Sequence, residues 1–576
     1  MCWWGFGAYA VGTVFLRTVK ADGVEYVQLV ENSWVDGKSR TKVIYGFGRK
    51  DKLDEEALVR LVGSVLRYVG EDRAGALKLG AGGEPPFSFL RAKELGGTHL
   101  LDGLWRRLGI DKAIQKAAAG REFSVPVERL LFALVANRAL APSSKLAAEA
   151  WVEDVAFIDA LPEVEVQQLY RAMDFLLDAK GAVERGVFDS VSHLFNLEVD
   201  LIFVDTTSTY FEIEEADEDV LDEATGEVVP GLRKRSKNSK DKRPDLPQAV
   251  MGFAVTRDGI PVKSWVWPGN TVDVSVVEEI KKDLNDWRLS RMVLVMDTGF
   301  NSEANRRVLQ GAGDHFIIGE KMRGGDKSQA AQALKRAGRY QAISDNLSAK
   351  EVIVNAGSVT AERFIIVHNQ QEAERDAAKR ADIVAEAERR ILEVGDLTGK
   401  DHTKRVCALK ASPTFGKYLR ELKNGQLKLD KGKIASEAKL DGKYLIRTSD
   451  PHLSVKDVVL GYKQLFEIER VNRDLKHTID VRPVYHRKEE RIRAHVLLCW
   501  LALLLIRIAE TESGDSWHQL KKIFRSLQAA DHATPHGTIT QTNQLTAEQK
   551  RVLHAINVKP PKRFLDIPTR EKPENT

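Results

Sequence analysis

The sequence predicts an α/β protein whose central sheet contains both parallel and antiparallel strands. Two observations support this fold class. Residues 199–320 read as three strands followed by a helix, a strand, a helix and a strand, and the stretch before them repeats apolar residues every three to four positions. Strands that alternate with helices favour parallel pairing, whereas a hairpin in the same series requires antiparallel pairing. We therefore expect a mixed sheet preceded by a mainly helical N-terminal region.

Composition and charge limit the class of protein. The chain has 576 residues, 43% apolar and 30% charged, which indicates a globular protein of several domains. Its net charge of +4, from 87 Lys and Arg against 83 Asp and Glu, is too close to balance to indicate nucleic-acid binding by itself. The cysteines, Cys2, Cys407 and Cys499, have no zinc-ligand spacing and fit a reducing compartment. We expect a cytoplasmic protein.

The first elements form a small module. Residues 26–47 contain two strand-like runs around an Asp36-Gly37 turn, and a helix-like segment follows at residues 54–70. A Gly- and Pro-rich break at residues 79–89 separates this module from a helical region that reaches about residue 196. The run VERLLFALVANRAL in that region has the 3.6-residue apolar period of a helix.

The central series supplies the sheet. The run VDLIFVDTTSTYFEI is β-branched and aromatic, and QAVMGFAVTRDGIPVKSWVWPGN reads as a hairpin. A helix, the strand RMVLVMD, a second helix and the strand HFIIGE follow. Residues 321–441 break this pattern with strand-like pieces and one highly charged helix, which indicates an insert. The series resumes with the strand GKYLIRTS and a helix at residues 461–476. The apolar run at residues 496–506 is shorter than the ~18 residues of a membrane span, so we predict a buried core helix.

These elements divide the chain into six expected segments. They are a β-hairpin and helix module (1–78), a helical region (79–197), the first part of the core (198–320), the insert (321–441), the second part of the core (442–512) and a C-terminal tail (513–576).

Two carboxylates follow buried strands. Asp205 comes after LIFV and Asp297 after VLVM, and ligands of open α/β sheets bind at the carboxyl ends of strands. An Asp in this place can also simply cap the next turn. The helix at residues 461–476 can supply a third carboxylate, Glu469, although a charged helical stripe is often only solvated. Three converging carboxylates can hold two Mg²⁺ or Mn²⁺ ions. At 100° per residue, one stripe of this helix carries Tyr462, Leu465, Glu469, Asn472 or Arg473, and Lys476.

The series Tyr462, Leu465, Glu469 and Lys476 resembles the Tyr-x2-Arg-x3-Glu-x6-Lys signature of one branch of bacterial insertion-sequence DDE transposases, with Leu465 in place of the arginine. The resemblance extends over residues 201–508, through VDTTSTYFE, VMDTGFNSEANRRVL and RPVYHRKEERIRAHVLLCW. It implies an RNase H-like core with an insert before the glutamate helix. It also implies a DNA transposase that cleaves strands at the terminal inverted repeats of its element and joins them to target DNA as a homodimer, next to the nucleoid.

The same resemblance implies roles for individual residues. Asp205, Asp297 and Glu469 correspond to the catalytic ligands of Mg²⁺, for which Mn²⁺ can substitute. Tyr462 and Lys476 correspond to contacts with backbone phosphates beside the cut.

Other basic residues are candidates for DNA contact. Leu465 removes the arginine of the signature, so its phosphate contact is expected to move to Lys463 or Arg470, while Arg473 shares the stripe. The family often has arginine where this chain has Thr298.

Residues 231–244, GLRKRSKNSKDKRP, which we call the basic loop, have seven positive residues and one negative. Lys240 and Arg243 in this loop can bind DNA phosphates. A solvated loop neutralised by the acidic run before it is the alternative. Arg487 and Arg491 can line the same DNA channel. Asp273, in the run PGNTVD, is interpreted as part of a loop turn.

Two other functions stay open at this level. A metal-dependent nuclease of the same fold would hydrolyse DNA without joining it. An inactive DNA-binding remnant of a transposase would retain the fold while departing from the motif, as Leu465 and Thr298 do.

Overall fold

The computed structural model describes most of the chain and divides it into two compact units. The first consists of residues 1–92, 530–542 and 563–576, and the second of residues 93–529 and 543–562. The six-segment division remains a prediction. The described residues are 13–21, 23–35, 38–54, 60–62, 64–65, 88–123, 125–195, 201–223, 226–285, 292–323, 325, 328–358, 360–482, 484, 486–534 and 537–566.

The first unit contains two small sheets. The strands predicted within residues 26–47 are confirmed, because β2 pairs with β3 from Tyr26↔Arg49 to Val35↔Lys38. Strand β1 adds an unpredicted third strand. Asp36, Gly37 and most of the helix expected at 54–70 lie outside the described residues. The elements are β1 (Thr13–Ala21), β2 (Val24–Val35), β3 (Lys38–Arg49) and η1 (Lys50–Lys52), and a second sheet in the order β20-β19-β18-β4 with β4 (Ser88–Glu94), β18 (Gln528–Thr534), β19 (Gly537–Thr542) and β20 (Phe564–Asp566).

The second unit begins with the predicted helical region. Its helices are α3 (Gly96–Arg107), α4 (Ile110–Ala118), α5 (Val127–Leu140), α6 (Lys145–Asp154), α7 (Val166–Asp178) and α8 (Lys180–Phe195). Helix α5 is buried on nearly every face, because α7 and the long helix α17 (Glu489–Ser513) both pack against it. A helix that is apolar all round requires such neighbours on every side.

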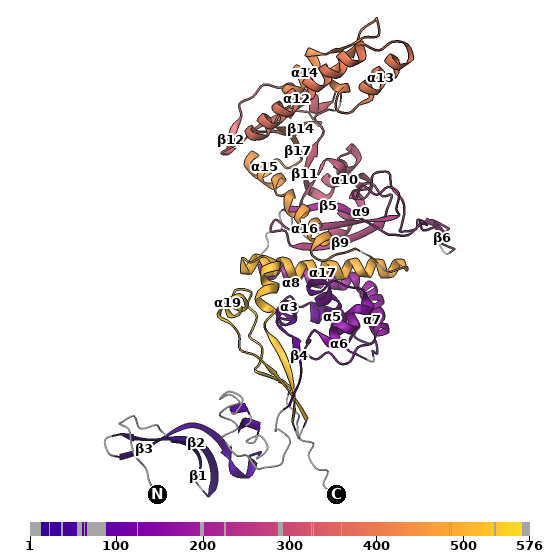
Figure 1. The fold of residues 1–576 in the computed structure, drawn as a ribbon. Coiled ribbons are helices and arrows are strands. Elements are labelled where there is room, and N and C mark those ends of the chain that lie inside the picture. Colours follow the sequence, from indigo (N-terminus) through magenta and orange to yellow (C-terminus); the bar gives the residue numbers. More distant parts are fainter. Residues whose placement is uncertain are drawn as a thin grey trace. The chain divides into compact units, whose positions relative to one another are not determined.

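A nine-stranded mixed sheet forms the core of this unit, as predicted (Figure 1). Its order is β12-β13-β14-β17-β11-β10-β5-β8-β9, and β10 runs parallel to both β5 and β11, while the other neighbours are antiparallel. The strands are β5 (Leu201–Tyr210), β8 (Gln248–Val255), β9 (Pro261–Pro268), β10 (Val293–Met296), β11 (His315–Glu320), β12 (Gln341–Ser344), β13 (Leu347–Val354), β14 (Glu362–Asn369) and β17 (Lys443–Thr448).

Helices cover the sheet where apolar periodicity predicts them. On α9 (Val277–Asn285), the buried residues Val277, Ile280 and Leu284 recur at helical spacing and join a core cluster with strand residues such as Ile202 and Leu294. Helix α10 (Glu303–Gln310) follows β10. Short turns are η2 (Asp273–Ser275), η3 (Thr298–Phe300) and η4 (Gly311–Gly313), and β6 (Val220–Leu221) pairs with β7 (Val228–Val229) in the loop after β5.

Helix α17 is longer than the apolar run that predicted it. By length and composition it is the one helix among the described residues that could cross a membrane, but 94% of its apolar window is buried inside the protein. It packs against α5 and α7 on one side and β9 on another. The prediction of a core helix is therefore confirmed. Helices α18 (Trp517–Phe524) and α19 (Ala547–Ala555) follow it in the chain.

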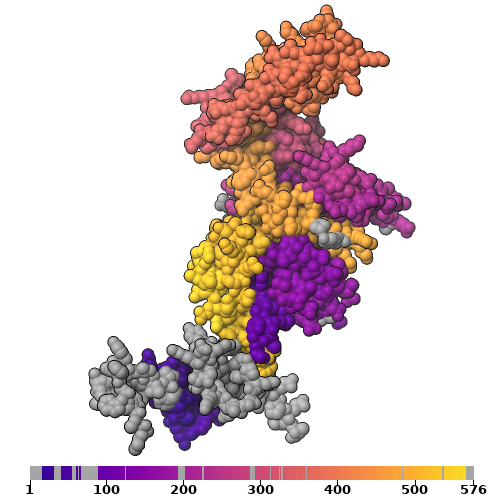
Figure 2. All heavy atoms as spheres, in the orientation of Figure 1, coloured from indigo at the N-terminus to yellow at the C-terminus, as the bar shows by residue number. Residues whose placement is uncertain are grey.

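The segment expected as an insert is partly continuous with the core. Strands β13 and β14 extend the central sheet, and β14 pairs directly with β17. Residues 370–441 instead build their own small apolar cluster, which includes Ala387, Val406 and Leu419. The surface of this segment is orange in Figure 2. The elements of the whole segment besides its sheet strands are α11 (Gln329–Lys335), α12 (Gln370–Gly395), α13 (Gly399–Ala411), η5 (Gly416–Tyr418), β15 (Leu419–Glu421), β16 (Leu427–Leu429) and α14 (Lys431–Ala438).

The single helix predicted at residues 461–476 is wrong. The structure has two helices, α15 (Val455–Lys463) and α16 (Leu465–His477), with Gln464 between them. Helix α15 packs on β10, β11 and β17, whereas α16 packs on β5, β8 and α17. One straight helix could not follow both surfaces. Tyr462 and Glu469 therefore do not share a helix.

Candidate active site between β5 and β10

Asp205 and Asp297 lie side by side on neighbouring parallel strands. The last registered pair of β5 and β10 is Val204↔Met296, so the next residue of each strand is an aspartate. Paired strands are about 4.8 Å apart, and residues in register on them point to the same face. The Asp297 Oδ1 accepts a hydrogen bond of 2.7 Å from the Gly299 amide as the chain turns into η3.

One detail of the predicted position of Asp205 is wrong. Strand β5 does not end at Asp205 but continues to Tyr210, because β8 pairs with it along that length, with Asp205 opposite Phe253. Only the partner strand β10 ends at this level.

Glu469 approaches the two aspartates from α16. The Asn472 Nδ2 donates a hydrogen bond of 3.0 Å to the Asp205 Oδ2, which fixes α16 against β5. Glu469 lies three residues earlier, so it is on the same face and about 4.5 Å along the helix axis. Its side chain is exposed and forms no hydrogen bond or ion pair with any residue that the structure describes. Glu469 is thus about one helical turn from the residue bonded to Asp205, and its carboxylate has no partner among the described residues.

A fourth carboxylate, Asp273, reaches the same place. Its Oδ1 accepts hydrogen bonds from the Thr206 hydroxyl and, at 3.1 Å, from the Lys240 ammonium. A Cβ added to Gly299 would lie 2.9 Å from the Asp273 Oδ2 and 3.0 Å from the Asp297 Oδ1, so these two oxygens flank one point. Asp273 is in a turn, as interpreted, but its carboxylate faces the candidate site.

Lys240, expected to contact DNA, instead lies among these oxygens. Its ammonium is 2.7 Å from the Thr206 carbonyl oxygen and 4.0 Å from the Asp205 Oδ1, and it also donates to the Thr206 hydroxyl. A cation surrounded by carboxylate, carbonyl and hydroxyl oxygens indicates that the site suits a hard metal ion, which prefers oxygen ligands.

In the described part of the chain, no three His, Cys, Asp or Glu side chains are already close enough to hold a metal together. Asp205, Asp297 and Glu469 can be the ligands if α16 adjusts.

Burial raises the pKa of Asp205 to about 6, and the nearby carboxylates of Asp297 and Asp273 add to the effect against the opposing charge of Lys240. Since the ordinary value is 3.8, the folded state holds this proton more tightly than the unfolded state. The carboxyl therefore lowers stability increasingly as the pH rises from about 4 to 6, and the loss is complete above this window.

We accordingly predict that Asp205→Asn raises the melting temperature of the metal-free protein above about pH 6 and changes it little near pH 4. Thermal unfolding in EDTA between these pH values measures the effect. Asp245→Asn is the control, because Arg243 lowers the pKa of Asp245, so its loss should become more destabilising as the pH rises. A pH-independent difference between Asp205→Asn and the unaltered chain would contradict this environment of Asp205.

Tyr462, which is on α15, lies near the carboxylates of the candidate site. Its ring stacks on Tyr444 with a centroid distance of 6.0 Å. Burial, together with Asp297, raises the pKa of Tyr462 to about 12, so its hydroxyl stays protonated and can donate to a phosphate. The two tyrosines line a cavity of about 250 Å³ with Thr298, Glu320, Lys321, Met322, Arg323 and Leu445.

Gly319 on β11 makes room for this tyrosine. A Cβ at position 319 would lie 2.3 Å from the Tyr462 Oη and 2.7 Å from the Thr298 Cγ2. We predict that Gly319→Ala displaces Tyr462 and slows the DNA cleavage that the motif resemblance implies on the order of 100-fold, as misplacement by about 1 Å can. Single-turnover cleavage assays measure the rate. Gly338→Ala, whose new Cβ meets only the Lys350 Cδ at 3.4 Å, should cleave normally. A wild-type rate for Gly319→Ala would show that Tyr462 is not needed.

Lys476 is engaged within the protein. Its ammonium donates to the Asp241 Oδ1 at 2.8 Å, and Arg482 lies 3.5 Å from the same oxygen. Asp241 belongs to the basic loop, so the predicted phosphate contact at Lys476 is occupied by a carboxylate of this chain.

The other candidate DNA contacts divide into exposed residues and residues that are engaged within the protein. Lys463, Arg473 and Arg487 are exposed. Arg470 instead pairs with Glu510 of α17 at 3.0 Å, and Arg491 packs over the Tyr170 ring at 4.4 Å.

Arg243 of the basic loop pairs at 2.7 Å with Asp245, which lies just beyond the loop. The residues that sequence reasoning missed are Asp241, Asp273 and Tyr444. Only Asp273 was weighed from the sequence, and none of the three has a local motif that marks it.

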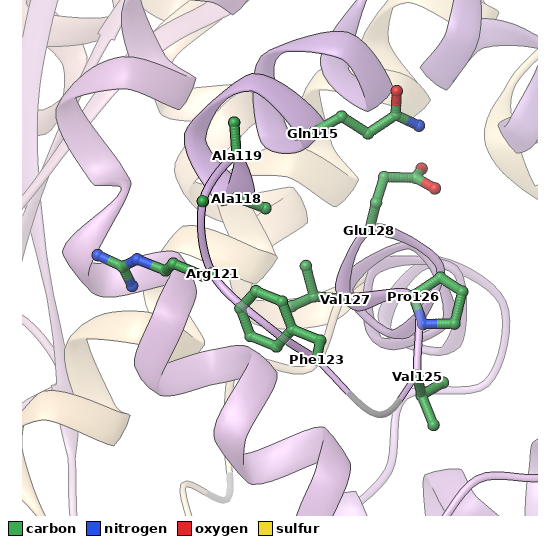
Figure 3. Close-up of a pocket in the computed structure, with 10 residues that line it drawn as sticks. Gln115, Ala118, Ala119, Arg121, Phe123, Val125, Pro126, Val127 and Glu128 are labelled. Atoms are coloured by element: carbon green, nitrogen blue, oxygen red, sulfur yellow. The ribbon is translucent and has the colours of Figure 1, made fainter.

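Another cavity, of about 470 Å³, opens in the helical region between α4 and α5 (Figure 3). The Glu128 carboxylate at its edge already accepts hydrogen bonds from Trp105 and Arg129. Its lining comes from residues 115–128, without any of the four carboxylates described above, so this cavity is separate from the candidate active site.

Comparison with known families identifies the class of protein. Residues 253–505 match the transposase DDE domain, in a range that contains Asp297 and Glu469 but starts after Asp205. The protein is a DDE transposase, which is a metal-dependent phosphoryl-transfer enzyme acting on DNA, and its core is RNase H-like. Residues 16–75 match the N-terminal domain of IS1634 family transposases. The chain belongs to the IS1634 family of insertion-sequence transposases, which confirms the resemblance seen in the motifs.

Two further comparisons add little. No curated protein matches the chain. Among solved structures, the chain is similar to the piggyBac transposase in a synaptic complex with hairpin DNA, at 10% identity and a TM-score of 0.33, over 75% of this chain and 79% of that chain.

Proposed function

We propose that this transposase holds two Mg²⁺ ions with Asp205, Asp297 and Glu469, cleaves DNA at the terminal inverted repeats of its element and joins the freed 3′ ends to target DNA. The observation that supports this assignment is the register of β5 and β10, which sets the two aspartates side by side, with Glu469 one helical turn from the amide bonded to Asp205. Mn²⁺ is expected to substitute for Mg²⁺, because both are cations that accept oxygen ligands.

The chain's own residues have separate tasks in this mechanism. When bound, the metal pair supplies an activated oxygen nucleophile and stabilises the leaving oxygen of the phosphodiester. Asn472 keeps α16 in contact with Asp205 and so orients Glu469. The protonated Tyr462 hydroxyl is placed to donate to a phosphate oxygen beside the cut. Lys476 can hold the next phosphate once it leaves Asp241.

The remaining assignments extend this proposal to the whole chain. The helical region of residues 79–197 recognises the element ends, two copies of the chain pair in the DNA complex, and the protein works in the cytoplasm at the nucleoid. The exposed residues Lys463, Arg473 and Arg487 support a path for the DNA backbone past α15 and α16.

The test uses the whole chain and a duplex that carries one terminal inverted repeat, taken from the sequence flanking the coding region. We expect strand cleavage in Mg²⁺ or Mn²⁺ and none in EDTA. A pre-cut end with a free 3′ hydroxyl should then be joined to plasmid DNA. Cleavage without joining would indicate a nuclease, and binding without cleavage would indicate an inactive remnant. Either result would overturn the proposed function.

A further inference from the structure

The basic loop places two neighbouring residues of opposite charge in the candidate active site. Lys240 inserts its ammonium among the oxygens of Asp205, Asp273 and Thr206. The next residue, Asp241, directs its carboxylate to Ser208, Lys476 and Arg482.

Both carboxylate oxygens of Asp241 have partners within the protein. Its Oδ1 accepts from Lys476 at 2.8 Å and lies 3.5 Å from Arg482, while its Oδ2 accepts from the Ser208 hydroxyl at 3.0 Å. The Asp241 side chain is only 8% exposed, and that of Lys476 15%. An ion pair so shielded from water is screened little by salt, so its exchange for another partner has a measurable effect.

The contact of Lys240 with the carboxylates corresponds to the metal of the proposed reaction, and the contact of Asp241 with Lys476 and Arg482 corresponds to the DNA phosphate. Carboxylates that gather to bind a metal repel one another, and a lysine ammonium can neutralise them while the metal is away. A lysine and an arginine that meet one carboxylate also offer the donor set for one phosphate. Both substitutes come from adjacent residues of one loop, so a movement of the loop backbone there withdraws both.

We propose that the Lys240-Asp241 pair is an internal occupant of the active site, in which Lys240, held by Asp205 and Asp273, takes the place of a divalent cation at Asp205, and Asp241 takes the place of a DNA phosphate at Lys476 and Arg482. Metal and DNA displace the pair together. The inference rests on the proposed function of the carboxylates and adds a means of regulating them.

Joint displacement makes the binding of metal and of DNA cooperative. A metal that expels Lys240 also draws Asp241 away from Lys476, which frees a site for phosphate. By linkage, metal must raise DNA affinity by the same factor by which DNA raises metal affinity, and couplings of this kind are typically about 5- to 150-fold. An empty transposase is thereby kept from holding DNA tightly before the metal is present.

The first experiment measures the affinity for a fluorescent duplex in EDTA by anisotropy. Asp241→Asn should bind about tenfold more tightly than the unaltered chain, because Lys476 and Arg482 become available to phosphate. The matched control is Asp245→Asn, which makes the same charge change in an exposed residue just beyond the basic loop. The gain should disappear when Lys476→Gln is combined with Asp241→Asn. Equal affinities of the Asp241→Asn and Asp245→Asn variants would overturn the proposal.

The second experiment measures Mn²⁺ binding without DNA, by electron paramagnetic resonance of the free ion. Lys240→Gln should bind Mn²⁺ several-fold more tightly, because the competing ammonium is gone, whereas Lys237→Gln in the same loop should not. Unchanged Mn²⁺ affinity in Lys240→Gln would overturn the part of the proposal that concerns Lys240.

Asp297→Asn separates this result from a failure of the proposed function. If it abolishes Mn²⁺ binding while Lys240→Gln has no effect, the metal site stands and only the internal occupant is wrong. If Asp297→Asn leaves Mn²⁺ binding intact, the assignment of the metal ligands itself is wrong, and with it the role of Lys240 as a substitute for the metal.

Discussion

Asp297→Asn, Asp205→Asn and Glu469→Gln should each reduce metal-dependent cleavage of element-end DNA by more than about 1000-fold. Each amide removes one anionic oxygen ligand, a metal pair contributes several kcal/mol to the reaction, and each 1.36 kcal/mol is a factor of ten in rate. Gel assays of single-turnover cleavage in Mg²⁺ measure the loss.

The DNA affinity of these variants in EDTA should remain within a few-fold of the unaltered chain, because the carboxylates do not attract phosphate. Glu303→Gln is a matched control, since this carboxylate is exposed on α10 and pairs with Arg307 one turn away. A normal cleavage rate in any of the three variants would show that its carboxylate is not a metal ligand.

Arg507→Met should destabilise the second unit by about 3–5 kcal/mol, the usual cost of removing one partner from a buried ion pair. The Arg507 side chain is 3% exposed and joins α17 to α16 through Glu467 at 2.8 Å. It also contacts Glu510 at 3.1 Å, and the carbonyl oxygen of Gly259 accepts from its Nε. Methionine fills a similar volume without the charge, so the glutamates lose their partner. Because Glu469 is on α16, cleavage should fall as well.

Urea or thermal unfolding of the whole chain measures the loss of stability. Arg307→Met makes the same change in an exposed pair and should cost less than 1 kcal/mol. Combining Arg507→Met with Glu467→Gln should recover part of the loss, because fewer buried charges remain unpaired. A melting temperature unchanged by Arg507→Met would contradict the buried role of this arginine.

Sequence patterns predicted much of the core because its strands are short apolar runs with polar ends. The strand HFIIGE matches β11 residue for residue, and the aspartate after VLVM marks the end of β10. The family resemblance also named Asp205 and Asp297, which the structure places next to each other on neighbouring strands, whereas the role of Glu469 as their partner stays a prediction. Local signals were sufficient where a strand or helix is defined by its own residues.

Other features depend on partners distant in the chain and could not be predicted. The break at Gln464 has no proline to announce it and arises because α15 and α16 pack on different strands. Lys240 lies 33 residues from Asp273, and Asp241 lies 235 from Lys476, so their contacts have no spacing that a motif could reveal. Asp205 was placed at the end of its strand because the pairing of β5 with β8 beyond this residue is invisible in one strand alone.

The pairing of β14 with β17 has a consequence for protein engineering. Residues 370–441 leave and rejoin the sheet at adjacent points, since the Asn369 amide donates to the Gly442 carbonyl oxygen at 2.8 Å and His368 is registered with Lys443. Two antiparallel strands whose ends meet in this way can be closed by a two-residue turn. A compact transposase can therefore be designed by replacing α12 to α14 with such a hairpin, whereas a deletion that also removed β13 and β14 would leave β17 as an unprotected, aggregation-prone edge.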